Sequence, residues 1–425
     1  METYQDREAY LAACREQALL PAGFRAATTS LTFYPLELGQ TKAYPMNLSL
    51  ILLDEPTPAF HAMFTKNLFC GAPIILGRER LREKFCRGIL ANNKISNVAT
   101  PTGLDDAEMV LKVLAKLLAC KAKQFFPAST GIIGWRLPAK EMCTSLPVLV
   151  NNLQAQTLLP VAEAIMTTDS YPKVRRRVLG EGSIVACAKG AGMIEPALGT
   201  MLLFVLTDLC VPRALLAQAL KEAIADTINC ISIDGDQSTS DLAIILSSCK
   251  KRLPSYEAFK QALKEILAEL SDDIVRNGEG AGHVIRVSVT EAPNLKIARL
   301  ASKAIVNSPL VKTAIYGNDP NVGRIVAALG DYLGLSGIKV DRKGIRVRMG
   351  GITIFEHNSF LLDENKEQKL SQYLRDTAYS LEQKFPPHKK QVEIEITLGA
   401  GRGQAWALGS DLGEGYVKEN SAYRS

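Results

Sequence analysis

The segment from Lys189 to Asp208 constrains this chain more than any other, because one threonine joins a small-residue stretch to a hydrophobic run. It reads K-G-A-G-M-I-E-P-A-L-G-T-M-L-L-F-V-L-T-D. Thr200 can attack the carbonyl of Gly199 by an N-to-O acyl shift, and hydrolysis of the resulting ester would free its α-amine. An α-amine titrates near pH ~7.7, so it can act as the general base for the hydroxyl. The same residues also fit a simpler interpretation, in which the glycines form loops before a buried helix.

Length and composition predict a globular protein with two lobes. The chain has 425 residues, which exceeds what one hydrophobic core usually serves. Its 47% hydrophobic and 22% charged residues are typical of soluble proteins, and the net charge of +6 is modest. The densest basic cluster, Lys173 with Arg175, Arg176 and Arg177, contains no interleaved aromatic residues. We therefore expect a solvated loop there and no nucleic-acid partner.

Cysteine spacing and hydrophobic runs argue against metal-stabilised, disulfide-rich, secreted and membrane-spanning proteins. Nine cysteines are scattered singly, with no C-x-x-C and no paired Cys/His spacing. This pattern argues against a structural metal site and against a disulfide framework. The N-terminus lacks an apolar core, so we expect no signal peptide. The longest apolar run, Met201 to Leu206, is far shorter than the ~20 residues of a membrane span. We expect a cytoplasmic protein without a membrane segment.

Hydrophobic periodicity predicts several helices. Apolar residues recur at helical spacing between Asp105 and Gln124, and Thr102 with Asp105 resembles a capping box ahead of them. Pro212 stands where a first-turn proline is tolerated and opens another helix. A further helix is predicted from about Tyr256 to Val275.

Strand patterns complete an α+β reading. Leu48 to Leu53 is a continuous apolar run, which suits a strand buried on both faces. Val284 to Thr290 and Val392 to Leu398 alternate between apolar and polar residues, so both predict half-exposed strands. Gly350 and Gly351 lie between two short apolar strands and predict a hairpin turn. Mixed strands and helices with antiparallel hairpins favour a layered α+β architecture.

Several segments, taken in their order along the chain, resemble the ornithine acetyltransferase (glutamate N-acetyltransferase) family. The self-processing segment of that family typically reads K-G-S-G-M-I-x-P-x-x-A-T-M-L, which is similar to the stretch around Thr200. The other matching segments begin at Phe64 (F-T-K-N-L-F-C-G-A-P), Ser129 (S-T-G-I-I-G-W-R-L-P), Ala164 (A-I-M-T-T-D), Asp234 (D-G-D-Q-S-T-S-D), Gly278 (G-E-G-A), Ser308 (S-P-L-V-K-T-A-I-Y-G-N-D-P-N-V-G-R) and Tyr416 (Y-V-K-E-N-S-A-Y).

The resemblance implies a fold and an activity. It implies two central sheets between helical layers, an αββα sandwich similar to N-terminal-nucleophile hydrolases, with a smaller α/β lobe from about residue 283. Cleavage would divide the chain into residues 1–199 and 200–425. The implied reaction moves acetyl from N²-acetylornithine to glutamate through an acetyl ester on Thr200, with no cofactor and no metal. The resemblance leaves open whether acetyl-CoA is a second donor, and it implies an α2β2 assembly of two cleaved chains.

Acyl transfer needs a nucleophile, a base and a pocket for the developing oxyanion. Thr200 with its own amine would supply the first two, and its β-branch restricts the rotamer of the hydroxyl. The family's oxyanion hole matches Thr130 and Gly131, which offer a side-chain hydroxyl and a backbone N–H that glycine leaves open to a ligand. A plain strand-to-loop turn is the alternative interpretation of this pair.

Substrate contacts also follow from the resemblance alone. Lys189 matches a family lysine expected to meet the substrate carboxylate, and Glu279 matches an acid expected to pair with the ornithine side-chain ammonium. The residues after Glu279 include Gly282-His283, where Thr-Lys is common in the family. The other matching substrate positions are Thr167 or Thr168, between which the sequence does not choose, Asn420 and Ser425.

Other enzyme classes fit the sequence less well. Gly399-Ala-Gly-Arg-Gly follows a strand, but too few residues remain after it for a dinucleotide-binding βαβ unit. No G-x-S-x-G occurs, so a serine hydrolase is disfavoured. Two alternatives stay open: an amidase or aminopeptidase on the same self-cleaving fold, and an uncleaved non-catalytic scaffold. Gly199, which replaces the family's usual alanine before the threonine, keeps the scaffold in play.

Overall fold

The computed structural model describes residues 2–195, 201–380 and 385–421, and it divides into two compact units. The larger unit comprises Leu11–Asn229 and Gln237–Ile274, and the smaller unit comprises Met1–Tyr10, Cys230–Asp236 and Val275–Ser425. Gly199, Thr200 and Ser425 lie outside the described residues. The predicted division of the chain at Gly199–Thr200 and the predicted start of the second lobe at about residue 283 therefore stay predictions.

Two sheets form the centre of the larger unit. The first has four strands in the order β1-β2-β4-β5, and the second has five in the order β3-β10-β8-β7-β6. The strands of the first sheet are β1 (Phe24–Phe33), β2 (Tyr44–Thr57), β4 (Cys86–Asn92) and β5 (Phe125–Ser129). Those of the second are β3 (Phe60–Phe64), β6 (Lys173–Leu179), β7 (Gly182–Lys189), β8 (Leu202–Leu209) and β10 (Leu242–Lys251).

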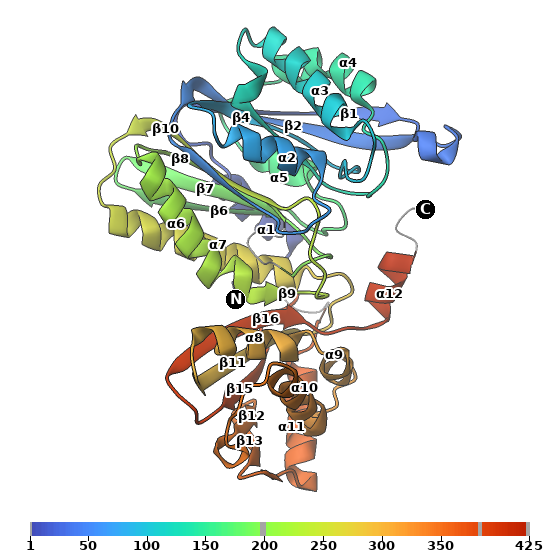
Figure 1. The fold of residues 1–425 in the computed structure, drawn as a ribbon, viewed down its shortest axis with the longest axis vertical. Helices are drawn as coiled ribbons and strands as arrows, with labels where there is room; N and C mark the ends of the chain where they lie inside the picture. Colours follow the sequence, from blue (N-terminus) through green and yellow to red (C-terminus); the bar gives the residue numbers. More distant parts are fainter. Residues whose placement is uncertain (1, 196–200, 381–384, 422–425) are drawn as a thin grey trace. The chain divides into compact units, whose positions relative to one another are not determined.

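The two sheets stack face to face, with helices on their outer sides (Figure 1). Phe60 of β3 and Phe126 of β5 meet edge to face across the interior, with ring centroids 5.8 Å apart. Helices α3 and α4 cover the four-stranded sheet, and α6 and α7 cover the five-stranded one (Figure 1). This arrangement is the predicted αββα sandwich. The helices of the unit are α1 (Arg7–Gln17, which begins in the smaller unit), α2 (Ala72–Arg80), α3 (Gly103–Leu117), α4 (Ala139–Asn151), α5 (Leu159–Ala164), α6 (Arg213–Asp226) and α7 (Tyr256–Arg276, whose last residues belong to the smaller unit).

The predicted elements of this unit are largely confirmed. The apolar run Leu48 to Leu53 lies within β2 and is fully buried, as expected for a strand between two layers. The helix predicted for Asp105 to Gln124 ends earlier, at Leu117, because Ala119 adopts a left-handed backbone with φ 51°. The predicted capping box is wrong: the Thr102 hydroxyl donates to the Asp106 carboxylate at 2.5 Å instead of accepting a backbone N–H.

The prediction for the basic cluster is wrong. Lys173 and the following arginines form strand β6, whereas the sequence predicted a solvated loop. Lys173 is fully buried, and its ammonium donates to Asp169 at 2.6 Å. Arg175 is also buried and forms an ion pair with Asp273 of α7. Carboxylates thus offset the cost of burying both cations, one from the segment directly before the strand and one from α7, which composition alone could not reveal.

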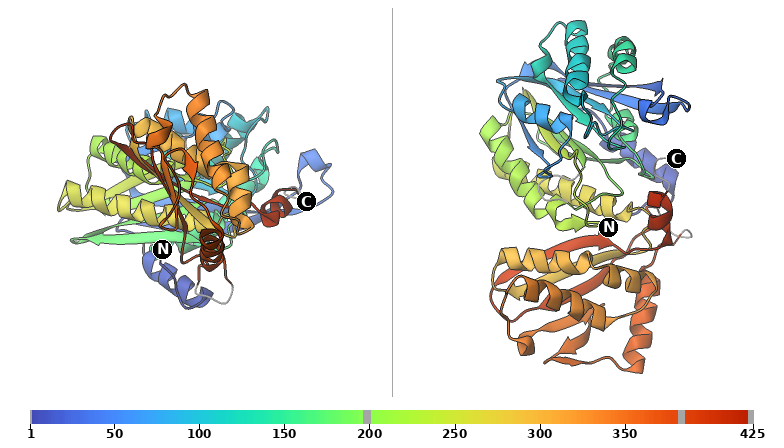
Figure 2. Two further views of the ribbon diagram at one scale, coloured as in Figure 1. Left: turned by 90° about the horizontal axis from the view of Figure 1, so that it is seen from below. Right: turned by 45° about the vertical axis from the view of Figure 1, so that its right-hand side comes forward.

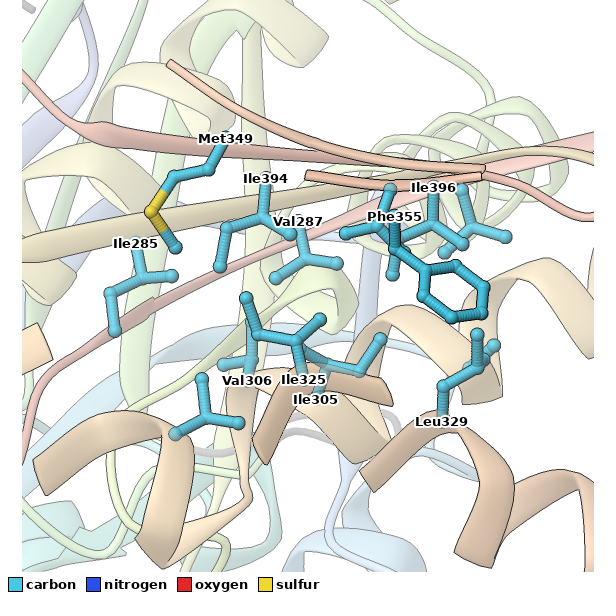
Figure 3. Close-up of a cluster of buried hydrophobic side chains, with 14 of the residues drawn as sticks. Ile285, Val287, Ile305, Val306, Ile325, Leu329, Met349, Phe355, Ile394 and Ile396 are labelled. Atoms are coloured by element: carbon cyan, nitrogen blue, oxygen red, sulfur yellow. The ribbon is translucent and has the colours of Figure 1, made fainter. Parts of the chain in front are cut away.

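The smaller unit is a single seven-stranded sheet covered by helices. Its strand order is β14-β13-β12-β15-β11-β16-β9. Figure 3 shows the core, in which Ile285, Val287, Ile394 and Ile396 of the sheet meet Ile305, Ile325 and Leu329 of the helices. The strands are β9 (Ile231–Ser232), β11 (Val284–Ala292), β12 (Arg346–Met349), β13 (Ile352–Glu356), β14 (Ser359–Phe360), β15 (Val392–Thr397) and β16 (Gly403–Ser410). The helices are α8 (Leu295–Val306), α9 (Pro309–Tyr316), α10 (Val322–Leu335), α11 (Glu364–Thr377) and α12 (Glu414–Ser421).

Strand predictions in this unit are confirmed. The alternating segments become β11 and β15, which pair in parallel with Ile285 opposite Val392. The Gly-Gly hairpin links β12 to β13, and both glycines have positive φ, 54° at Gly350 and 80° at Gly351. Two positive φ values in a two-residue turn are the type I′ geometry that twisted hairpins favour. Figure 2 shows the helices between residues 295 and 335 against the sheet of this unit, whereas α12 stands apart from it.

No helix among the described residues combines the length and apolar character that crossing a membrane requires.

Candidate active site

The strand that follows Thr200 lies at the centre of the five-stranded sheet. Its first residue, Leu202, stands opposite Lys189 of β7 on one side and Leu242 of β10 on the other. The backbone N–H of Leu242 donates to the carbonyl of Met201 at 2.9 Å. Met201, the residue bonded to Thr200, therefore lies near the end of β7 and the start of β10.

Lys189 belongs to a network of buried charges at this end of the sheet. Its ammonium donates to the Thr167 hydroxyl at 3.2 Å. The Asp169 carboxylate accepts from the Thr167 N–H at 3.1 Å, the Gly190 N–H at 2.8 Å and the Lys173 ammonium at 2.6 Å. Burial opposes the negative charge of Asp169, but Lys173, Lys189 and these hydrogen bonds outweigh it and hold its pKa at about 2. Asp169 is thus a fixed anion that orders Thr167 and the end of β7.

A second buried carboxyl, Asp241, behaves in the opposite way. It lies directly before β10, and burial raises its pKa well above the usual range. Hydrogen bonds from Ser238, Thr65 and the Met201 N–H, together with the charge of Lys189, oppose that rise without cancelling it. Among these groups Lys189 is the sole cation, whereas Asp169 has Lys173 in direct contact. The pKa values of the two carboxyls are therefore shifted in opposite directions, although Lys189 acts on both.

Thr130 and Gly131 follow β5, and the two donors that matter here are the Thr130 hydroxyl and the Gly131 backbone N–H. The neighbouring backbone groups are engaged within the turn. The Thr130 N–H donates to the Asn92 carbonyl at 3.1 Å, and the Ile132 N–H donates to the Lys94 carbonyl at 2.8 Å. Within the part of the chain that the structure describes, neither the Thr130 hydroxyl nor the Gly131 N–H donates to an acceptor. Gly131 has φ 121°, and a Cβ there would lie 2.2 Å from the Lys94 carbonyl carbon. An alanine Cβ would therefore clash at this position, so the turn needs glycine.

The loop opposite Gly131 is strained. Lys94, Asn97 and Ala99 all have positive φ, between 55° and 74°. Non-glycine residues adopt this conformation rarely, and such strain clusters at functional sites. The backbone here is held by many bonds, including Ala72 N–H to the Asn97 carbonyl at 3.0 Å and the Asn97 amide to the Gly103 carbonyl at 2.9 Å.

Two hydrogen bonds join the Gly131 region to the Lys189 network. The Asn93 amide donates to the Met166 carbonyl at 3.1 Å, next to Thr167. The Ser240 hydroxyl donates to the Ser96 carbonyl at 3.4 Å, next to Asp241. The structure therefore brings Thr130, Gly131, Thr167 and Lys189 to one end of the sandwich, where Lys189 stands opposite Leu202, two residues after Thr200. Thr168 is half-buried beside Thr167 and also belongs to this end.

The remaining predicted contacts belong to the smaller unit. The Asn420 amide donates to the Glu279 carboxylate at 2.7 Å, so two predicted substrate residues are in direct contact. The Tyr416 hydroxyl donates to Asp234 at 3.2 Å. Burial and then the negative charges of Asp234 and Glu279 raise the pKa of Tyr416. Burial and the same Asp234 raise the pKa of Asp236. Asp234 and Glu279 thus both act on the Tyr416 hydroxyl.

Sequence reasoning assigned no role to Asp169 or Asp241. Each ends a motif that carries the family resemblance, M-T-T-D and D-Q-S-T-S-D respectively, so a signal was present. Their roles depend on partners such as Lys189 and Met201, which only the paired strands bring near.

Comparison with known proteins places the chain in a family. The model of the ArgJ family matches residues 36–425. The chain belongs to the ArgJ family. An ArgJ relative from Methylococcus capsulatus, an arginine biosynthesis bifunctional protein, is 37% identical over 377 residues, covering 86% of this chain and 88% of the relative. Another, from Rhodococcoides fascians, is 34% identical over 407 residues, covering 96% of this chain and 95% of the relative.

A solved ArgJ structure is also similar. The crystal structure of the arginine biosynthesis bifunctional protein argJ from Bacillus halodurans is 34% identical, with a TM-score of 0.45. The match covers 52% of this chain and 98% of that one.

Proposed function

We propose that this protein is an acetyltransferase of arginine biosynthesis, which moves acetyl from N²-acetylornithine to glutamate through an ester on Thr200. The observation that carries the proposal is the cluster at one end of the sandwich. There, the Thr130 hydroxyl and the Gly131 N–H, which donate to no acceptor among the described residues, lie at the same end of the sandwich as Lys189, which contacts Thr167 and stands opposite Leu202. Membership of the ArgJ family supports the same reaction.

The reaction divides into two acyl transfers. The Thr200 α-amine takes the proton of the Thr200 hydroxyl as its oxygen attacks the acetyl carbonyl of N²-acetylornithine. The carbonyl oxygen becomes an oxyanion, which the Thr130 hydroxyl and the Gly131 N–H stabilise. The C–N bond then breaks, the protonated amine returns its proton to ornithine, and acetyl stays on Thr200. In the second half, the amine of glutamate attacks this ester and leaves as N-acetylglutamate, which restores the hydroxyl.

The two substrates differ in the charge of their side chains. Both carry an α-carboxylate, which Lys189 and Thr167 or Thr168 would hold through one shared set of contacts. Ornithine carries an additional side-chain ammonium, and glutamate carries a carboxylate in its place. Glu279 would attract the side-chain ammonium of the donor, and Asp234 and Asp236 would add negative charge. Asn420 orients Glu279, and Ser425 is the remaining substrate contact that the family resemblance supplies.

Self-cleavage between Gly199 and Thr200 would create the catalytic amine. The fragments of 199 and 226 residues would stay together, because the five-stranded sheet contains strands of both. Strands β8 and β10 of the second fragment lie between β3 on one side and β7 with β6 on the other. Two cleaved chains would assemble as α2β2 in the cytoplasm.

Cleavage is tested by mass and by N-terminal sequencing of the purified protein. We expect two fragments and a Thr-Met-Leu-Leu N-terminus, and we expect Thr200→Ala to leave one chain of 46.2 kDa without transferase activity. An intact, inactive wild-type chain would favour the non-catalytic scaffold.

Transfer is tested with N²-acetylornithine or acetyl-CoA as donor and glutamate as acceptor. Activity with the first donor supports the proposal, and activity with both would make the enzyme bifunctional. Parallel double-reciprocal plots and a trapped acetyl-Thr200 are expected from the two-step route. Release of free acetate without N-acetylglutamate would instead identify an amidase on the same fold.

A further inference from the structure

In the smaller unit, a buried histidine and aspartate join the two segments that carry Glu279 and Asn420. We call residues 277–282 the Glu279 loop; it precedes β11, and α12 with Asn420 follows β16. Val284 of β11 pairs with Ser410 of β16. His283 and Asp411 therefore continue the same antiparallel pair by one residue, at the point where both segments leave the sheet.

The contacts between these two residues are reciprocal. His283 Nδ1 lies 2.7 Å from Asp411 Oδ2, and Asp411 Oδ1 accepts the Gly282 N–H at 2.8 Å. The Asp411 N–H in turn donates to the His283 carbonyl at 3.1 Å. Both side chains are almost completely buried, with 3% and 0% of their surface exposed. One carboxylate thus holds both the histidine ring and the backbone of the Glu279 loop.

The second ring nitrogen links the histidine to α11. His283 Nε2 lies 3.1 Å from the Leu374 carbonyl in α11, and a carbonyl only accepts. Nδ1 lies beside the Asp411 carboxylate, so both ring nitrogens lie within hydrogen-bond distance of oxygen atoms. Burial, and then the charge of Arg276, lower the pKa of the neighbouring His388 to about 4.

The Glu279 loop has little freedom once this pair is formed. The Ala281 carbonyl contacts His388 Nε2 at 3.2 Å, and the Tyr379 N–H donates to the Gly282 carbonyl at 2.6 Å. Gly280 packs on the backbone at the start of α12, where an added Cβ would lie 2.4 Å from the Tyr416 nitrogen. The carboxylate of Glu279 then meets Asn420 at 2.7 Å. The ion pair, the glycine contact and this hydrogen bond close a ring between the loop and α12.

We propose that the His283–Asp411 ion pair is a positioning device that holds the Glu279 loop against α12 and thereby sets affinity for an acyl donor with a cationic side chain. The proposal rests on the proposed substrate role of Glu279. Loss of the positive charge at residue 283 leaves the Asp411 carboxylate without its buried partner and frees the loop. The glutamate acceptor lacks the ammonium that Glu279 holds, so its reaction is affected less.

The first test compares the two half-reactions in three variants. His283→Gln keeps a hydrogen-bond donor without charge, His283→Lys keeps the charge, and His357→Gln removes an exposed histidine of the same unit as a control. We measure ornithine release from N²-acetylornithine and, separately, attack of glutamate on the acetylated enzyme. We expect His283→Gln to raise the donor KM about tenfold, the scale of one weakened charge-assisted contact, with little change for glutamate. His283→Lys should restore the donor KM, and His357→Gln should match wild type.

The outcomes separate this proposal from the proposed function. Equal damage to both half-reactions, a wild-type donor KM in folded His283→Gln, or failure of His283→Lys to restore it would overturn the positioning role alone. Glu279→Gln serves as the reference: an unchanged donor KM in that variant would refute the substrate role of Glu279 itself. Should the His283 variants fail to fold, nitrogen NMR of wild-type protein labelled at histidine still decides. An imidazolium at pH 7 supports the ion pair, and a neutral ring overturns it.

Discussion

Gly131→Ala is the sharpest test of the oxyanion site, because the same loop provides its control. At Gly131 an added Cβ would lie 2.2 Å from the Lys94 carbonyl carbon and 2.3 Å from its oxygen, at φ 121°. At Gly134, three residues on, φ is 86° and nothing lies within 4 Å of an added Cβ. Both alanines impose an unfavourable backbone, but only the first collides with another segment. The difference between the two variants therefore isolates the contact with Lys94.

The expected magnitudes follow from these two terms. A non-glycine residue in such a backbone conformation costs ~1–3 kcal/mol, which both variants share. Forcing a methyl group into an occupied position costs a further ~1–3 kcal/mol, which applies to Gly131→Ala alone. The backbone shift that relieves the clash also displaces the Gly131 N–H. Loss of one oxyanion donor lowers kcat by ~10²–10³-fold, whereas Gly134→Ala should keep near-normal turnover.

Urea unfolding and steady-state kinetics on the same preparations measure both effects. Because the chain has two units, midpoints of the transition are compared rather than fitted free energies. We expect the midpoint of Gly131→Ala to fall clearly below that of Gly134→Ala. Equal midpoints with equal kcat values would refute both the steric argument and the placement of the oxyanion donors.

Three further predictions concern the site. Thr130→Ala should lower kcat by ~10²–10³-fold without moving the unfolding midpoint, since its hydroxyl donates to no acceptor among the described residues; wild-type turnover would remove Thr130 from the oxyanion site. The pKa of Asp169 is about 2, below its unfolded value, so its ion pair with Lys173 stabilises the fold above about pH 4. This contribution to the free energy of unfolding, about 2 kcal/mol, should disappear as the pH falls toward 2. The Asp169→Asn variant should lack that part of the acid transition in circular dichroism. The raised pKa of Asp241 has the opposite effect on stability, because the unfolded carboxyl loses its proton first and stability declines as the pH rises above about 4. Asp241→Asn should therefore flatten the dependence of stability on pH above about pH 4. An unchanged slope would show that the folded carboxyl is ionised.

Local patterns predicted the fold where the deciding interactions are local. The alternation in β11 and β15 and the two glycines of the β12–β13 hairpin were sufficient, since strand faces and turn geometry depend on neighbouring residues. The end of α3 was missed because an alanine, Ala119, takes the left-handed position that glycine usually marks. The Cys120 N–H bonds back to the Ala115 carbonyl at 2.9 Å and closes the helix there.

The site was predictable only through motif positions. Lys189 and Gly131 stand in segments that carry the family resemblance, and the structure gives each a defined environment. Composition could not predict that Lys173 would be buried, since its partner Asp169 precedes the strand and removes the cost of its charge. The opposite direction of the pKa shifts of Asp169 and Asp241 is likewise invisible in the sequence. It depends on whether a lysine lies in direct contact with each carboxyl.

The strand order of the five-stranded sheet has a consequence for how such a protein refolds after it has been unfolded. Strands from before and after the Gly199–Thr200 bond share the sheet, with β8 and β10 inserted together between β3 and β7. Before cleavage, the polypeptide that joins β7 to β8 makes sheet formation a first-order process within one molecule. After cleavage, the same sheet would have to be rebuilt by the encounter of two separate molecules. A mature enzyme that is unfolded by heat would recover at a rate that depends on its concentration, whereas the uncleaved Thr200→Ala protein would recover at a rate independent of dilution.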